Sequence, residues 1–100
     1  MATRNLIQIQ QVCTHCGVEI SFIHSLHELG HIEVIVENDD QFIDEEQLRT
    51  LEKMIYFHSE LQINLEGIDA IAHLLHKIDS LQQELTATRN KLDAFSREQA

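Results

Sequence analysis

Lysine and arginine are missing from a long stretch of this chain. Neither occurs between Asn5 and Leu48, and residues 1–48 hold nine carboxylates against Arg4 alone, a net charge of −8. The remaining 52 residues are close to balanced at −2, so the whole chain reaches −10. Because Lys and Arg supply the attraction to a phosphate backbone, this composition argues against nucleic-acid binding and favours a basic partner, approached faster at low salt. A simpler interpretation, in which acidity gives only solubility, stays open.

Proline and tryptophan are also absent, and glycine occurs only three times. No apolar run approaches the roughly 20 residues that a membrane span needs. The first residues contain no apolar signal-peptide core, so we expect a cytoplasmic protein that does not bind a membrane. Two cysteines without a secretion signal do not indicate a disulfide framework. At 100 residues the chain can form one thin core with an appended element.

Catalytic motifs are missing as well. The sequence has no Gly-x-Ser-x-Gly motif, no glycine loop that would cradle a phosphate, and no nucleophile with an identifiable base. Nothing distinguishes a catalytic carboxylate pair from surface charge. We therefore expect a protein that is not an enzyme and uses no cofactor.

The apolar pattern of the first half predicts two short helices and a hairpin. Residues 9–16 and 19–29 are predicted helices, separated by a left-handed cap at Gly17. Residues 32–36 and 41–43 alternate around an Asn-Asp-Asp turn and are predicted strands, while residues 6–10 suit either a strand or a lead-in to the helix. The expected inward side chains are Ile9, Val12, Cys13, Cys16, Ile20, Phe22, Ile23 and Leu26.

Two further helices are predicted in the second half. Asp44 is an N-cap candidate for a helix over residues 45–61, with Gln47 at the capping-box position. Asn64 is expected to cap a last helix that continues to about residue 96. Tyr56, Phe57 and His58 interrupt the inward stripe of the first of these helices and suit the core, a domain–domain contact or an exposed patch. That stripe is Leu48, Leu51, Ile55 and Leu61.

The last helix carries apolar residues at alternating steps of three and four. This spacing gives four heptads in which only Thr88 is polar. The stripe either packs on its own domain or joins a second copy, and we favour a homodimer because the other elements are too short to cover it. The charges beside the stripe do not choose between parallel and antiparallel pairing. The predicted dimerisation residues, here called the heptad stripe, are Ile71, Leu74, Ile78, Leu81, Leu85, Leu92 and Phe95.

Cys13 and Cys16 form a Cys-x-x-Cys pair with His15 inside it. On a helix the two thiols share a face and would supply half of a zinc site, but no second pair follows. We therefore favour buried thiols and no metal, and a zinc-binding adaptor stays open as a minor alternative. His24, His27 and His31 form either a pH-sensing face or separate, hydrogen-bonded side chains.

The order of these elements resembles the MerR-type winged helix-turn-helix. Residues 9–18 look like its first helix and turn, and residues 29–32, Leu-Gly-His-Ile, look like its exit from the second helix. Residues 61–68, Leu-Gln-Ile-Asn-Leu-Glu-Gly-Ile, look like the segment that opens its last helix. The resemblance implies a mainly α fold with a small hairpin wing and a long C-terminal helix that forms a coiled coil.

The DNA-contacting positions of that family are changed here. Where its readers present Arg-Thr-Leu-Arg-Tyr-Tyr-Glu, residues 21–27 read Ser-Phe-Ile-His-Ser-Leu-His. The wing, residues 33–40, reads Glu-Val-Ile-Val-Glu-Asn-Asp-Asp instead of carrying arginines. The groups that contact phosphates and base edges are gone, so DNA binding is not expected.

One branch of this scaffold, the chaperone-modulator proteins (CbpM-like), is similar in detail. Residues 12–18, Val-Cys-Thr-His-Cys-Gly-Val, resemble its Phe-Cys-x-His-x-Gly-Ile opening, and residues 31–33 resemble its Val-Ile-Glu. The resemblance implies a regulator that binds the J-domain of a DnaJ-type (CbpA-like) co-chaperone, whose basic helix meets Hsp70, and restrains its action. The residues we expect to bind this partner, here called the acidic set, are Glu19, Glu28, Glu33, Glu37, Asp39 and Asp40.

The sequence thus predicts a winged helix-turn-helix domain over residues 1–61. A long helix over residues 62–100 is the predicted dimerisation element. The predicted function is inhibition of a J-domain co-chaperone. The alternative is a MerR-type transcriptional regulator with a degenerate DNA-binding surface.

Overall fold

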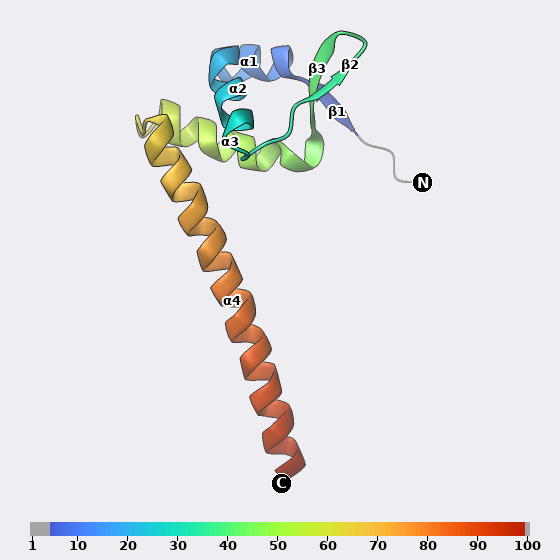
Figure 1. Cartoon of the computed structure of the whole chain (residues 1–100), viewed down its shortest axis with the longest axis vertical. Helices are drawn as coiled ribbons and strands as arrows, with labels where there is room; N and C mark the ends of the chain where they lie inside the picture. Colours follow the sequence, from blue (N-terminus) through green and yellow to red (C-terminus); the bar gives the residue numbers. More distant parts are fainter. Residues whose placement is uncertain (1–4, 100) are drawn as a thin grey trace. The chain divides into compact units, whose positions relative to one another are not determined.

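The computed structural model of the chain describes residues 5–99, which form four helices and a three-stranded sheet (Figure 1). The chain divides into two compact units, Met1–Asp69 and Ala70–Ala100. The first unit contains β1 (Leu6–Gln8), α1 (Ile9–Cys16), α2 (Ile20–Glu28), β2 (Ile35–Glu37), β3 (Asp40–Asp44) and α3 (Glu45–Ser59). Helix α4 (Leu65–Gln99) begins in the first unit and makes up the described part of the second. The predicted mainly α fold is confirmed.

The sheet is antiparallel, with β3 between β1 and β2. The predicted hairpin is the β2–β3 pair, and its turn residues Asn38 and Asp39 both have positive φ, of 52° and 66°. Two successive left-handed residues match the twist of a tight hairpin, and Asn and Asp tolerate that conformation. Residues 6–8 resolve the choice left by the sequence, because they pair with β3 as a strand before α1 begins.

Helices α1 and α2 are joined by a short turn. Gly17 has φ of 70° and its backbone N–H donates to the Cys13 carbonyl, which is the left-handed cap that the sequence predicts. Ile9, Val12 and Cys13 are buried as expected, while Cys16 is half-buried.

Ile20 was predicted to face inward, and this is wrong, since its side chain is 41% exposed. The buried side of α2 is set by Phe22, Ile23 and Leu26. Ile20 lies about 110° round the helix from the mean direction of those three.

The strand predicted over residues 32–36 is shorter and lies later, at Ile35–Glu37. Ile32 instead belongs to the connecting loop and is buried there. The loop is held by a side chain that was predicted to do something else. Gln47 does not close a capping box at the start of α3, because its Oε1 accepts a 2.8 Å hydrogen bond from the Glu33 backbone N–H.

Asp44 caps α3 as predicted, accepting a hydrogen bond from the Glu46 backbone N–H at 3.0 Å. The helix ends at Ser59, so Leu61 lies beyond it and is exposed, contrary to the prediction. Leu51 and Ile55 are buried as expected. Met54 fills the remaining inward position of this face.

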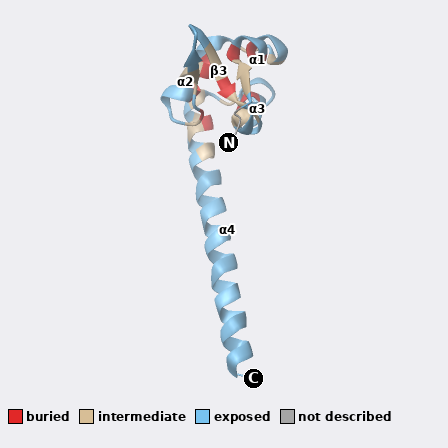
Figure 2. Cartoon of the chain, turned by 90° about the vertical axis from the view of Figure 1, so that its right-hand side faces the viewer, coloured by how far each residue is buried: buried red, intermediate tan, exposed pale blue. Residues whose placement is uncertain are grey.

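The core lies in the first unit, between α1, α2, α3 and β3 (Figure 2). Its fully buried side chains come from every one of these elements and from the start of α4, where Ile68 is buried as well. Within residues 5–99, no helix is long and apolar enough to cross a membrane. The fully buried large side chains are Ile9, Ile23, Leu26, Ile43, Leu51 and Ile68.

Candidate partner-binding surface

All six residues of the acidic set are exposed. Glu19 precedes the first residue of α2, and Glu28 is its last residue. Glu33 lies in the loop before β2, where Gln47 holds its backbone. The other three lie at the end of the hairpin, since Glu37 and Asp40 face each other across β2 and β3 and Asp39 belongs to the turn between them.

The hairpin end is therefore a compact negative feature. No Lys or Arg among residues 5–99 forms an ion pair with Glu37, Asp39 or Asp40. Carboxylates close together at the end of a short hairpin create a local negative potential, which attracts a basic surface and repels a polyanion.

Apart from Ile20, the exposed side of α2 is polar, and it carries no Lys or Arg. Ser25 donates its hydroxyl to the Ser21 carbonyl, a local bond within the helix. His24 is tied to the sheet, because its Nε2 lies 2.7 Å from Gln41 Oε1 on β3. Side chains committed to such internal bonds hold the helix in place and leave no long donor that would reach a base edge or a phosphate.

His27 lies between two backbone groups of the loop that follows α2. Its Nδ1 is 3.2 Å from the Ile32 carbonyl oxygen and also 3.2 Å from the Val34 backbone nitrogen. A bare Nδ1 accepts from the Val34 N–H, whereas a protonated Nδ1 donates to the Ile32 carbonyl. One nitrogen cannot make both hydrogen bonds in the same protonation state.

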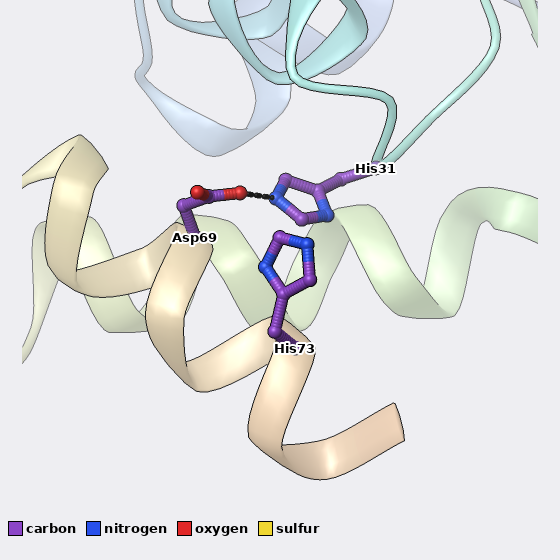
Figure 3. Close-up of side chains that lie close together, drawn as sticks. All are labelled: His31, Asp69 and His73. Carbon is purple, nitrogen blue, oxygen red and sulfur yellow. Dashed lines mark hydrogen bonds and ion pairs between the residues drawn. The ribbon is translucent and has the colours of Figure 1, made fainter. Parts of the chain in front are cut away.

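His31 connects the same loop to the first turns of α4. Its Nε2 lies 2.6 Å from Asp69 Oδ1, and its side chain is only 10% exposed (Figure 3). The three histidines of residues 24–31 are thus each held by a different part of the fold, and the structure favours hydrogen-bonded side chains over one shared face.

Cys13 and Cys16 are both free thiols. Burial raises the pKa of each, and the nearby Glu52 carboxylate raises the pKa of Cys16 further. Metal binding requires thiolates, so both effects oppose it. Among residues 5–99, no group of three converging His, Cys, Asp or Glu ligands contains either thiol.

The ring side chains that interrupt the inward stripe of α3 lie in different environments. Tyr56 is exposed, whereas His58 stacks on Phe22 of α2, with ring centroids 4.3 Å apart and planes 18° apart. The stack connects the last turn of α3 to α2. No pattern in the sequence indicates this contact beyond the unexplained position of His58.

The heptad stripe is solvent-exposed in the single chain, except for the half-buried Ile71. Leu81 and Leu85 are 54% and 50% exposed, and Phe95 at the far end is 58% exposed. Figure 2 shows α4 as exposed along most of its length. Large apolar side chains repeated along one face are typical of a surface that another molecule covers.

A helix-turn-helix followed by a β-hairpin wing and a long C-terminal helix is the architecture of winged helix-turn-helix regulators. Residues 7–90 match the family described as MerR HTH family regulatory protein, and the chain belongs to this family. The match begins within β1 and ends within α4, so it covers all of α1, α2, β2, β3 and α3. A comparison with curated proteins found no match. A comparison with solved structures found none either.

Proposed function

We propose that this MerR-family chain is a non-catalytic regulator of a J-domain co-chaperone in the cytoplasm. It binds the J-domain of a DnaJ-type (CbpA-like) protein and restrains the action of that protein on Hsp70. The proposed binding surface is the acidic set, of which Glu37, Asp39 and Asp40 lie together at the hairpin end.

The observation that carries this proposal is the absence of Lys and Arg from a long stretch of the chain. Helices α1 and α2, the wing and the start of α3 contain no Lys or Arg between Asn5 and Leu48. A protein that binds DNA through these elements needs such groups to release the counterions of the phosphates. The same elements, made acidic, are complementary to the basic helix with which a J-domain meets Hsp70.

In this arrangement the chain competes with Hsp70 for the J-domain. A surface that covers the basic helix of the J-domain occupies the face that Hsp70 needs. Regulation then requires only binding, with no chemical step. This agrees with a chain whose family is described as regulatory.

The test is binding of a purified J-domain by isothermal titration calorimetry at low and high ionic strength. The variant combines Glu33→Gln, Glu37→Gln, Asp39→Asn and Asp40→Asn. Each exposed charge pair contributes roughly 0.2–1 kcal/mol, so we expect affinity to fall about tenfold or more and its salt dependence to weaken.

The matched control removes four charges elsewhere: Glu60→Gln, Glu84→Gln, Asp93→Asn and Glu98→Gln. It changes net charge equally and should leave most of the affinity in place. Unchanged affinity and salt dependence in the hairpin variant would contradict the proposed binding surface. No J-domain binding by the unaltered chain would contradict the function itself.

The family match favours a second candidate, a transcriptional regulator with a degenerate DNA-binding surface. Electrophoretic mobility shift at physiological ionic strength separates the two. Tight, sequence-selective binding of duplex DNA by the purified chain would replace the co-chaperone proposal with this one.

We also propose that the heptad stripe joins two copies of the chain. Leaving a large apolar side chain in water costs about 1.5–3 kcal/mol relative to burying it, and the stripe repeats that cost along the helix. Pairing with an identical stripe removes it. The direction of the pairing is left open by the charges that flank the stripe, which are mixed in sign.

A further inference from the structure

A hollow of about 630 Å³ lies between the start of α2 and the end of α3. Its lining includes Gly17 in the turn, Glu19, and the hydroxyl-bearing residues Ser21, Ser25 and Ser59. Phe22 and His58 also line it. The hollow lies within the first unit and opens beside Glu19, a member of the acidic set.

The hollow contains a flat aromatic surface. Phe22 is only 7% exposed, while the His58 ring stacked on it is exposed, so the imidazole forms the outer layer of the stack. His58 Nδ1 lies 3.4 Å from the Ile63 carbonyl oxygen, which limits rotation of the ring. We call this pair of rings the ring platform.

One negative charge accompanies the ring platform. Glu19 is exposed, and within residues 5–99 its side chain accepts a single hydrogen bond, of 3.4 Å, from the Ser21 hydroxyl. No Lys or Arg among residues 5–99 pairs with Glu19 or lies over either ring. The hollow therefore offers a carboxylate and a stacking surface that the chain itself leaves unused.

A guanidinium is the group that uses both features at once. It is planar and stacks on aromatic rings, and its forked N–H groups bind a carboxylate with two parallel hydrogen bonds. A lysine ammonium uses the charge but stacks poorly, because it is a compact and strongly hydrated point charge. An anionic ligand would be repelled by Glu19.

We propose that this hollow is a binding site for an arginine side chain of a protein partner. The guanidinium lies on the ring platform and pairs with Glu19. The site rests on the proposed function only in requiring a basic partner, and it adds a preference for arginine over lysine that net charge alone would not give.

The test measures that preference directly with two probes, an oligoarginine and an oligolysine peptide of equal length and equal label. Fluorescence anisotropy at low ionic strength gives both affinities for the full chain. We expect the unaltered protein to bind oligoarginine at least about twofold more tightly than oligolysine, because only the guanidinium can stack on the ring platform and make paired hydrogen bonds to Glu19.

Three variants locate the preference. Glu19→Gln and His58→Ala should each bring the ratio of the two affinities close to one. His58→Phe keeps a ring on Phe22 and should preserve the ratio, which also guards against loss of fold in His58→Ala. Glu60→Gln removes a charge near the hollow without changing its lining, and should weaken both peptides equally.

Equal affinities for the two peptides in the unaltered protein would overturn the arginine site. A ratio that survives both Glu19→Gln and His58→Ala would overturn it too. Because neither peptide is a J-domain, these results leave the co-chaperone proposal standing or falling on its own titration.

Discussion

Two effects disfavour the thiolate form of Cys16, namely burial and a nearby carboxylate. Its thiol is half-buried, and the Glu52 carboxylate of α3 acts on it across the groove that the two residues line together. Both effects raise its pKa, so at a given pH a smaller fraction of the thiol is ionised than in a free cysteine. Because the thiolate is the nucleophile, the residue should be poorly reactive.

Replacing Glu52 tests this. In Glu52→Gln the repulsion between carboxylate and thiolate is removed, so the Cys16 pKa should fall toward its ordinary value. Iodoacetamide labelling at about pH 8, read at Cys16 by peptide mass spectrometry, should then become severalfold faster.

Glu60→Gln, which removes a charge from the end of the same helix, serves as the control and should label at the original rate. Equal rates for Glu52→Gln and the unaltered protein would show that burial alone protects the thiol.

Some single residues have side-chain orientations or partners that the sequence did not predict. Ile20 was wrongly assigned to the inward face of its helix, and Met54 was left out of the predicted inward stripe although it is buried. Gln47 stands at the capping-box position of α3. Its side chain instead accepts a hydrogen bond from the backbone N–H of Glu33, which lies in a loop fourteen positions earlier. Such a partner is set by tertiary structure, and no local pattern contains it.

At the scale of elements, the helix caps were the most predictable feature. Residues 9–16 form a helix with the predicted bounds because its apolar spacing and Gly17 agree. Asp44 and Asn64 start the next two long helices for the same local reason, and Asn64 Oδ1 accepts a 2.8 Å hydrogen bond from the Gly67 N–H. Caps are local contacts, and local contacts can be predicted from neighbours in the sequence.

Removing the Asn64 cap should destabilise the protein by about 1 kcal/mol, since the Gly67 N–H at the start of α4 loses its acceptor. The measurement is urea denaturation of Asn64→Ala followed by circular dichroism. Asn90→Ala is the matched control, because Asn90 lies in the exposed middle of α4, where alanine favours the helix. A loss of stability in the control as large as in Asn64→Ala would mean that the cap contributes nothing.

Pairing between strands was less predictable than the helices. The β2–β3 hairpin was expected from its turn, but β1 reaches β3 across more than thirty intervening residues, and its three residues carry little pattern of their own. The stack of His58 on Phe22 has the same origin, since each ring belongs to a different helix. Both contacts depend on how helices pack, which periodicity does not determine.

At the scale of the whole molecule, the fold class and the family could be predicted from the sequence, whereas the proposed partner-binding surface stays a set of candidate residues. The acidic set follows from composition, which says that a surface is negative without saying which groups a partner contacts. The proposed arginine site depends on the three-dimensional placement of Glu19, Phe22 and His58 in one hollow, which no sequence pattern indicated.

The association state is a whole-molecule property that the heptad stripe predicts. Placing charge in the stripe with Leu81→Asp and Leu85→Asp should halve the mass found by sedimentation velocity, because buried carboxylates oppose pairing. Gln83→Asp with Asn90→Asp adds the same charge on the opposite side of α4 and should stay dimeric. An unaltered chain that sediments as a monomer at micromolar concentration would end the dimer proposal.

The position of β1 has a practical consequence for anyone who prepares this protein. β3 is the central strand only because Leu6–Gln8 covers one of its edges. Trimming the chain past Gln8 would bare a row of backbone donors and acceptors, and such an edge recruits strands from other molecules. A chain shortened in this way should therefore self-associate and precipitate, even though its hydrophobic core is left almost untouched. Tags are better attached through a spacer ahead of Asn5 than in place of the first strand.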